Sequence, residues 1–289
     1  MKPLIYFIIG TFINCLGFFS RKKAASLALR LFSTPMKGFI KKEQEEFLDS
    51  AFQEEFVYNN LPIITYRWPG NGKTIVLVHG WESNSARWEN LINLLNKKNY
   101  NIIALDAPAH GNSGSKRFNA VLYSEFINII VQRFKPDIVI AHSVGAMATM
   151  FAFEKNQYTS IEKVVLLSSP SEFQEILNRY VKMLFINRTV AKQLELLIKE
   201  RFNKLPTEFS TAKSSCSIST EGLIIHDKGD AVIPYNDALK IKENFKNSTL
   251  ITTENMGHSL NNDEVYNYVE EFLATKNVSL HYERTETAQ

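Results

Sequence analysis

The chain has 289 residues, of which 45% are hydrophobic, 12% aromatic and 22% charged. This is the composition of an ordinary globular protein, and it excludes a disordered chain, a collagen-like repeat and a protein with many membrane spans. The formal net charge of +3 is too small to predict a nucleic-acid-binding protein. The two cysteines, Cys15 and Cys216, make neither a disulfide framework nor a metal site, so we expect a reducing compartment and no metal.

Residues 1–50 form a predicted N-terminal helical segment that is apolar at first and then amphipathic. Pro3–Phe19 contains no charged residue, and Arg21-Lys22-Lys23 follows directly. As a helix this stretch would extend about 26 Å, slightly less than the roughly 30 Å of a bilayer core. The next stretch, Ala24–Phe32, alternates small or apolar residues with Arg30 in a pattern typical of a helix on a membrane or on a protein surface.

Three interpretations of this segment remain open: helices docked on the domain, association of residues 1–38 with a membrane surface, and export. A cleaved signal peptide carries its main positive charge before the apolar stretch, whereas here the stronger cluster comes after it. Positive charges of this kind stay on the inner side of a membrane. We therefore expect a cytoplasmic protein, with possible attachment to the inner face of the membrane.

Short runs rich in Ile, Val and Leu predict the strands of a sheet. Such continuous apolar runs are typical of parallel strands that are buried on both faces. Two further runs around Asn59-Asn60 predict an antiparallel hairpin at the start. The predicted strands are Glu55–Tyr58, Ile63–Trp68, Thr74–Val78, Asn101–Leu105, Asp137–Ala141, Lys163–Leu167, Leu223–Ile225 and Thr249–Thr252.

Helical patterns separate these strands, and the alternation predicts a mostly parallel, doubly wound α/β sheet over residues 51–275. A polar tail, residues 276–289, is expected to follow. The predicted helices are Arg87–Lys97, Val121–Phe134, Val144–Asn156, Tyr235–Phe245 and Glu264–Thr275.

One connection, about 173–215, is longer than a crossover between two strands requires. Open α/β sheets bind ligands at the carboxyl edge of their strands, so we expect this segment to form a helical lid there. Four of its side chains are candidates to meet an apolar substrate chain, unless they only cover the core: Tyr180, Met183, Leu184 and Phe185.

The residues around Ser143 point to nucleophilic chemistry. The strand before Ala141 runs into Ala141-His142-Ser143-Val144-Gly145 and then directly into a helix. Strand, sharp turn and helix, with small residues two before and two after a serine, is the context of a nucleophile elbow. Ala141 stands where glycine is usual, but alanine is also small. A plain helix-capping serine is the alternative reading.

Together with three other motifs in the same order, this sequence resembles the α/β-hydrolase superfamily, specifically its serine esterase and lipase branch. The resemblance extends from about Ile63 to Thr275 and implies the α/β-hydrolase fold. The other motifs are His79-Gly80-Trp81, the loop Asp106–Ser113, the loop His226–Pro234 and Met256-Gly257-His258.

The resemblance implies a catalytic triad of Ser143, Asp230 and His258. Serine is a weak nucleophile, so it requires a base, and a histidine accepts and returns a proton near neutral pH. A buried carboxylate orients that histidine. Spacing to Pro234 favours Asp230 over its neighbour Asp227 for this role, and both remain candidates.

The resemblance also implies an oxyanion hole formed by the backbone N–H groups of Trp81 and Val144. Trp81 and His142 are candidates for the substrate pocket, although each has a packing role as the alternative. We expect His79 and His110 to brace their own loops and His226 to have no metal partners. Glycine-rich nucleotide loops are absent, so we expect no cofactor.

These residues predict a serine hydrolase that cleaves a small-molecule carboxylic ester, less readily an amide, through an acyl-enzyme. An acyltransferase or a carbon–carbon bond hydrolase on the same triad is the alternative within enzymes, because the pocket rather than the fold chooses the acceptor. A non-catalytic binding protein on the same fold is the third reading.

Overall fold

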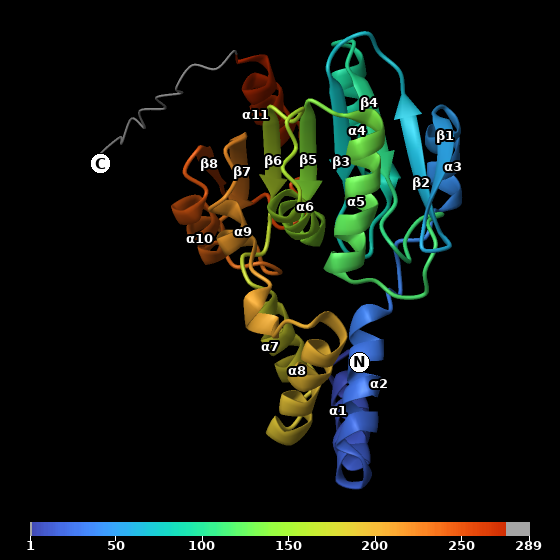
Figure 1. Cartoon of the computed structure of the whole chain (residues 1–289), viewed down its shortest axis with the longest axis vertical. Helices are drawn as coiled ribbons and strands as arrows, with labels where there is room; N and C mark the ends of the chain where they lie inside the picture. Colours follow the sequence, from blue (N-terminus) through green and yellow to red (C-terminus); the bar gives the residue numbers. More distant parts are fainter. Residues whose placement is uncertain (1, 276–289) are drawn as a thin grey trace.

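A computed structural model describes residues 2–275 of the chain, so the predicted tail at 276–289 lies outside the described residues. Its centre is an eight-stranded sheet in the order β1-β2-β4-β3-β5-β6-β7-β8 (Figure 1). β1 and β2 pair antiparallel, as do β2 and β4, and the other pairs are parallel. The strands are β1 (Phe52–Tyr58), β2 (Leu61–Trp68), β3 (Thr74–Val78), β4 (Asn101–Leu105), β5 (Ile138–His142), β6 (Lys163–Leu167), β7 (Glu221–Asp227) and β8 (Ser248–Thr253).

The predicted fold class is confirmed, and three strand predictions agree with the structure to the residue. In each of these three, β3, β4 and β6, one polar residue precedes four apolar residues that are buried on both faces of the sheet. β7 extends beyond its predicted core on both sides, because buried polar residues such as His226 and Asp227 continue the ladder.

Two hydrophobic layers cover the sheet. In β3, Val76 and Val78 face one layer and Ile75 and Leu77 face the other, as the two-residue period of a strand requires. The first layer contains α5 (Ala120–Phe134), α6 (Val144–Lys155), α9 (Thr211–Ser215) and α10 (Asn236–Asn244). The second contains α3 (Lys42–Asp49), the 3₁₀ turn η1 (Ser85–Trp88), α4 (Glu89–Asn96) and α11 (Asp263–Ala274).

The remaining helices build a separate bundle at the edge of the sheet where the parallel strands end (Figure 1). Here α1 (Lys2–Phe19) and α2 (Arg21–Ser33) pack with α7 (Phe173–Met183) and α8 (Arg188–Phe202). We call these four helices the cap. The cap has its own hydrophobic core, in which Ile13 of α1 and Leu194 of α8 are fully buried. The N-terminal segment and the insertion, far apart in sequence, thus form one unit.

A short neck joins the insertion to the domain. Phe173 N donates to Phe209 O at 3.0 Å, and the hydroxyl of Ser210 donates to Glu172 at 2.8 Å. The 3₁₀ turn η2 (Pro206–Glu208) precedes this point. The chain therefore leaves and re-enters the domain at one place, which leaves α7 and α8 free to pack on α1 and α2.

Close backbone contact fixes α1 to the turn between α7 and α8. The side-chain amide of Asn14 donates to Phe185 O at 2.8 Å and accepts from Asn187 N at 2.8 Å. A Cβ atom on Gly10 would lie 1.5 Å from Leu184 O, so only glycine permits this approach. Along the described residues, no helix is both long and apolar enough to cross a membrane.

Substitution of Gly10 by alanine tests whether α1 packs in this way. Alanine favours an isolated helix by roughly 0.5–1 kcal/mol over glycine. In the cap its methyl group would collide with Leu184 O, so we expect a net loss of about 1–3 kcal/mol instead. Hydrogen exchange of the α1 amides measures the change. The exposed neighbour Thr11, replaced by alanine, is the control and should not lose protection. Greater protection in the Gly10 variant would contradict the packing.

Candidate active site

The site begins at a strained turn between β5 and α6. Ser143 has φ 54° and ψ −129°, a backbone conformation that residues other than glycine rarely adopt. Its backbone N–H donates to Leu167 O of the neighbouring strand at 2.8 Å, and its carbonyl accepts from Ala146 N at 2.9 Å. The turn therefore presents the Ser143 hydroxyl at the carboxyl edge of the sheet, with α6 beginning at the next residue.

Two glycines allow other backbone segments to approach this turn. A Cβ atom on Gly145 would lie 2.3 Å from His79 O, and one on Gly80 would lie 2.9 Å from the Cβ of Ser143. The segment from His79 to Trp81 therefore lies directly against the nucleophile. This is the position from which the predicted donors, the N–H groups of Trp81 and Val144, would serve one oxyanion.

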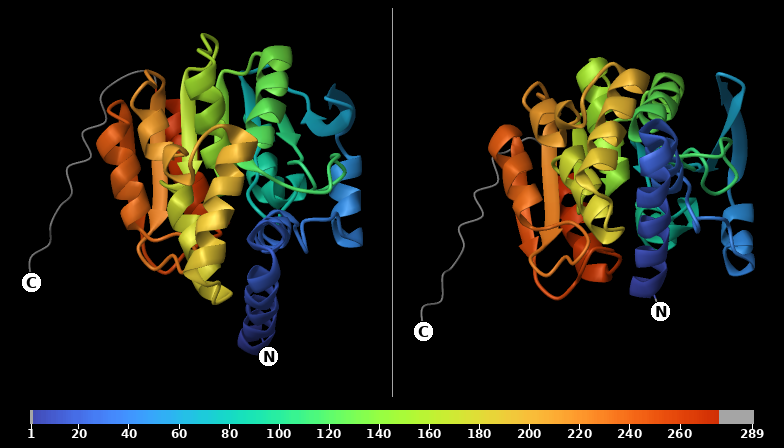
Figure 2. Two further views of the ribbon diagram at one scale, coloured as in Figure 1. Left: turned by 60° about the horizontal axis from the view of Figure 1, so that its bottom comes forward. Right: turned by 90° about the horizontal axis from the view of Figure 1, so that it is seen from below.

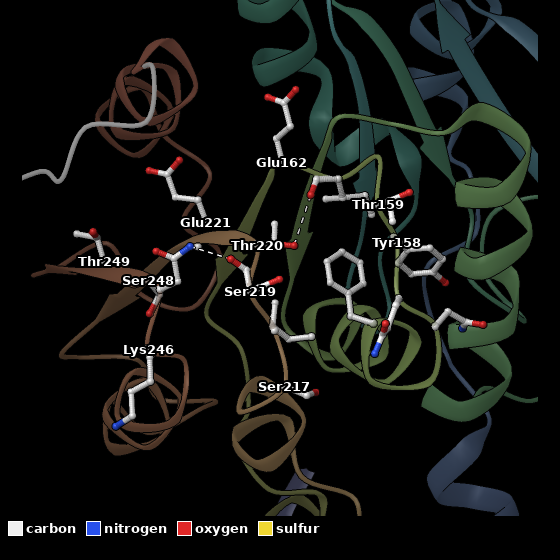
Figure 3. Close-up of a pocket in the computed structure, with 17 residues that line it drawn as sticks. Tyr158, Thr159, Glu162, Ser217, Ser219, Thr220, Glu221, Lys246, Ser248 and Thr249 are labelled. Carbon is white, nitrogen blue, oxygen red and sulfur yellow. Dashed lines mark hydrogen bonds between the residues drawn. The ribbon is translucent and has the colours of Figure 1, made fainter.

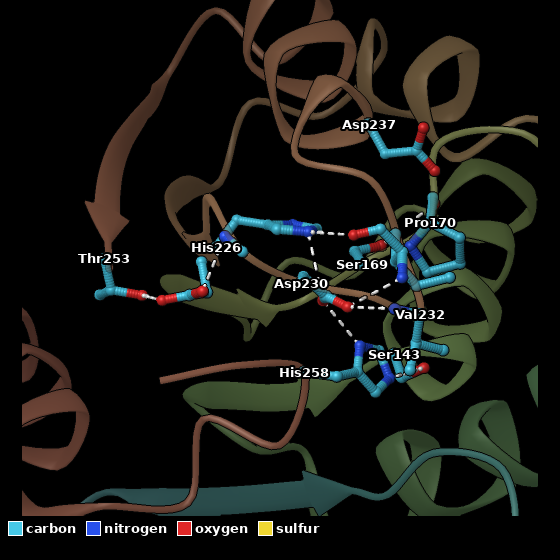
Figure 4. Close-up of polar contacts among 12 residues, drawn as sticks. Ser143, Ser169, Pro170, His226, Asp230, Val232, Asp237, Thr253 and His258 are labelled. Atoms are coloured by element: carbon cyan, nitrogen blue, oxygen red, sulfur yellow. Dashed lines mark hydrogen bonds and ion pairs between the residues drawn. The ribbon is translucent and has the colours of Figure 1, made fainter. Parts of the chain in front are cut away.

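His258 and Asp230 complete a hydrogen-bonded chain with Ser143 (Figure 4). His258 Nε2 lies 3.0 Å from Ser143 Oγ, and His258 Nδ1 lies 2.7 Å from Asp230 Oδ2. A carboxylate can only accept, so Nδ1 carries the ring proton and Nε2 is free to accept from the serine hydroxyl. The structure thus brings together the three predicted catalytic residues from three separate loops.

Asp227, the other candidate acid, has a different set of partners. One oxygen accepts from Gly229 N at 2.8 Å, and the other accepts from Met256 N at 2.9 Å and from the Thr253 hydroxyl at 3.0 Å. Burial raises the pKa of Asp227, but these hydrogen bonds outweigh burial and lower the pKa below its ordinary value. Asp227 therefore ties the loop after β7 to the loop that carries His258, without contacting the imidazole.

His226, for which the residue pattern indicated only that it lacks metal partners, lies beside the acid in the structure. Its Nε2 donates to Ile233 O at 2.9 Å and lies 3.4 Å from Asp230 Oδ2, the oxygen that also binds His258. His226 is fully buried. The one signal in the sequence is its spacing of four residues before Asp230, but the contact exists only because the loop folds back on the strand.

Asp230 is held as an anion. Burial alone would raise its pKa, but hydrogen bonds from His226, His258 and the Ile233 N–H outweigh burial and hold the pKa far below the ordinary range. The other carboxylate oxygen, Oδ1, accepts from the N–H groups of Val232 and Ile233 at 2.8 and 2.9 Å. The carboxylate is therefore charged and fixed in orientation at neutral pH.

His79 and His110 brace the loops beside the elbow. His79 Nε2 accepts from Ala107 N at 2.9 Å while Nδ1 donates to Gly80 O at 2.7 Å. His110 Nε2 accepts from Glu82 N at 3.0 Å. Burial lowers the pKa of both rings, so both are neutral braces near pH 7.

The two candidates for the substrate pocket are both in contact with structural partners. His142 Nε2 donates to His258 O at 2.9 Å and so supports the loop of the base, and burial lowers the pKa of His142 well below its ordinary value. Trp81 is half-buried and packs edge-on against His110 and Phe118. These contacts give both residues a supporting role whatever they do toward a substrate.

The predicted lid residues do not act alike. Tyr180 packs on Phe32, and its hydroxyl donates to Ala28 O at 2.7 Å. Leu184 is buried within the cap, whereas Met183 and Phe185 are exposed. Of the two interpretations left open for these side chains, Tyr180 and Leu184 follow the packing one, because they bind the insertion to the N-terminal helices.

A cavity of about 870 Å³ lies away from the triad, at the opposite edge of the sheet (Figure 3). It is lined by residues where β7 and β8 begin, including Glu221 and Ser248, and by Tyr158.

The nucleophile itself is largely covered, because Ser143 is only 5% exposed. In the described part of the chain, no cluster of three or more His, Cys, Asp or Glu side chains is arranged to hold a metal ion.

Comparison with known proteins identifies the family that the chain resembles. Residues 73–193 match the family model of the α/β hydrolase fold, and residues 203–281 match that of TAP-like proteins. The chain is 20% identical to the Bacillus subtilis (strain 168) AB hydrolase superfamily protein YisY over 230 residues, which is 65% of this chain and 86% of that protein. It is 34% identical to the uncharacterized hydrolase YugF of the same strain over 110 residues, 36% of this chain and 39% of that protein.

A solved structure, a putative lipase from Acinetobacter baumannii AYE, superposes with a TM-score of 0.61. The sequences are 16% identical, and the match covers 81% of this chain and 95% of the lipase. At this identity the likeness concerns the fold alone.

Substitution of each acidic candidate by asparagine separates their roles. Asp230→Asn removes the acceptor that sets the His258 tautomer, so we expect labelling of Ser143 by a fluorophosphonate to slow on the order of 10³–10⁴-fold. Asp227→Asn loosens the loop but leaves that acceptor in place, so its labelling should slow much less. If Asp227→Asn were the more damaging change, the assignment of Asp230 would be wrong.

His226 is expected to act as a positioning residue through Asp230. Replacement by alanine removes a hydrogen bond from the carboxylate, which leaves more of its charge for the His258 imidazolium. The acid limb of the labelling rate should therefore move to higher pH. His226→Gln keeps an N–H donor and should restore most of the shift. A slower reaction with an unmoved limb in His226→Ala would mean a purely structural role.

Proposed function

This chain belongs to the α/β-hydrolase superfamily and is a hydrolase of that fold, and on this premise we propose that it cleaves a carboxylic ester, less readily an amide, through an acyl-enzyme on Ser143. The single observation that supports the proposal most is the continuous chain of hydrogen bonds from Asp230 through His258 to Ser143. The strained turn beneath Ser143 supports it too, because structures keep such strain where it serves a function.

The reaction starts with attack of Ser143 Oγ on the ester carbonyl carbon. His258 Nε2 takes the hydroxyl proton, and Asp230 stabilises the imidazolium that results. The carbonyl oxygen becomes negatively charged, and the N–H groups of Trp81 and Val144 would donate to it. Collapse breaks the bond to the alcohol, which leaves with the proton from His258. Water then repeats the sequence on the acyl-enzyme, with His258 as base, and releases the acid and free Ser143.

Each component of this reaction comes from the chain or from water, so the proposal includes no cofactor. The substrate would be a small-molecule ester. Transfer to an alcohol instead of water would use the same acyl-enzyme. Product analysis with an added alcohol distinguishes the two outcomes.

We also propose that the protein is located on the cytoplasmic side of the membrane. The first 42 residues contain eight Lys or Arg and no Asp or Glu, and segments with such an excess of positive charge stay on that side.

A panel of p-nitrophenyl esters from acetate to palmitate tests the proposal with Ser143→Ala. Loss of the nucleophile should lower kcat on the order of 10⁴–10⁶-fold in a folded protein. The control is Ser124→Ala, because Ser124 is also a buried serine but its hydroxyl only donates to Val121 O within α5. Retention of more than about a tenth of the activity in Ser143→Ala would disprove the assignment. Failure of the folded wild-type protein to react with esters or with a fluorophosphonate would favour a non-catalytic protein.

A further inference from the structure

Helix α1 is apolar on two sides, and the cap covers only one of them. Ile13 is fully buried on the packed side, and Gly10 touches the α7–α8 turn. The other side exposes side chains that recur every three or four residues and so form one stripe along the helix. Figure 2 shows α1 at the periphery of the cap. The stripe consists of Leu4, Ile8, Phe12, Cys15 and Phe19.

The exposed apolar surface is larger than this stripe. Ile5, Phe7 and Phe18 of α1 are exposed beside it, with Phe18 85% accessible and Phe19 90%. The surface continues onto the α7–α8 turn, where the exposed ring of Phe185 contacts Phe7 edge-on, with their centroids 5.9 Å apart. A contiguous apolar surface of this kind marks an interaction site.

The charge of the N-terminal segment indicates what covers this surface. Residues 1–42 contain eight Lys or Arg and no Asp or Glu, whereas the whole chain has a net charge of +3. The remaining 247 residues therefore carry a net −5. Arg21, Lys22 and Lys23 begin α2, one residue after α1 ends, and all three are exposed, although Lys22 also pairs with Glu200 at 3.1 Å. A second copy of the chain would bring two strongly cationic segments together, whereas an anionic bilayer would neutralise them.

We propose that the cap docks on a bilayer rich in anionic phospholipid, with α1 lying in the plane of the interface. The stripe enters the boundary between headgroups and acyl chains, and Arg21-Lys22-Lys23 meets the phosphates. The packed side of α1 stays on the cap, because Asn14 remains bonded to Phe185 and Asn187. The cap lies at the edge of the sheet where the parallel strands end (Figure 1), and Ser143 follows β5 at that same edge.

The docking adds a substrate class to the proposed function, and the inference of that substrate class rests on the proposed function. If Ser143 cleaves esters, its substrates are amphiphilic esters with a long acyl chain that partition into the bilayer. Such molecules are concentrated in the interface where the cap lies. The docking itself requires no chemistry at Ser143, so the two proposals can be tested apart.

Vesicle co-sedimentation of the full chain carrying Ser143→Ala tests the docking. Vesicles of phosphatidylglycerol and phosphatidylcholine should bind the protein, and binding should weaken as salt rises. Ile8→Ser with Phe12→Ser should reduce the partition coefficient on the order of 10–100-fold. Both side chains are about 60% exposed, so the double substitution removes apolar surface that would otherwise enter the bilayer. Arg21→Gln with Lys23→Gln should weaken binding to anionic vesicles and not to pure phosphatidylcholine.

A matched pair on β1, the edge strand of the sheet and outside the cap, is the control. Phe52 and Val57 of β1 are exposed to a similar degree, 67% and 60%, against 62% for Phe12 and 58% for Ile8. Phe52→Ser with Val57→Ser should bind vesicles as the parent does. The proposal is overturned if no vesicle binds the protein, or if both pairs lose binding equally. A dimer in solution that Ile8→Ser with Phe12→Ser abolishes would show that a second copy covers the surface instead.

Activity then separates the function from the docking. With Ser143 intact, the Ile8 and Phe12 pair should leave turnover of p-nitrophenyl acetate unchanged and slow hydrolysis of a long-chain ester in vesicles at least about tenfold. Vesicle binding without any ester turnover would refute the proposed function and leave the docking standing. Equal loss on both esters would refute the link between docking and substrate class.

Discussion

The close approach of two backbone segments at the nucleophile is the constraint on which the rest of the site depends. Gly145 lies against His79 O and Gly80 lies against Ser143, at distances that a Cβ atom would not allow. This contact holds the strained backbone of Ser143 in place. It also brings the segment after β3 to the turn after β5 at one point, and these two segments carry the proposed oxyanion donors, the N–H groups of Trp81 and Val144. The loops of Asp230 and His258 then need only reach that point.

Much of the fold and the chain order of the site residues could be predicted from local sequence. β3, β4 and β6 are apolar on both faces, so their residue types alone mark them. Ser143 and His258 each follow a predicted parallel strand, so both are expected at the carboxyl edge of the sheet. The spacing to Pro234 favoured Asp230 over Asp227 without excluding Asp227, and in the structure the Asp230 carboxylate contacts the imidazole whereas that of Asp227 binds Met256 N.

Two features could not be predicted, because both depend on contacts between distant residues. The cap joins Asn14 to Phe185, which are 171 residues apart, and no local pattern shows that the two helical segments pack together. Because of this pairing, Tyr180 contacts α2 and Leu184 contacts α1. In a lid without the N-terminal helices, both side chains would be available to contact a substrate. The contact of His226 with Asp230 depends on a loop that turns back on β7.

The pairing of α1 with the insertion also sets the order of events during synthesis. α1 and its neighbour α2 are made first, but the insertion that packs against both is made about 170 residues after α1. At 5–20 residues per second, the ribosome adds these residues in roughly 10–30 seconds. During this interval α1 can pack on α2 but not on α7 and α8, so more of its apolar surface is exposed than in the folded protein. The nascent helix can therefore bind another apolar surface near the ribosome before the insertion is made. The insertion later packs on only one of its two apolar sides.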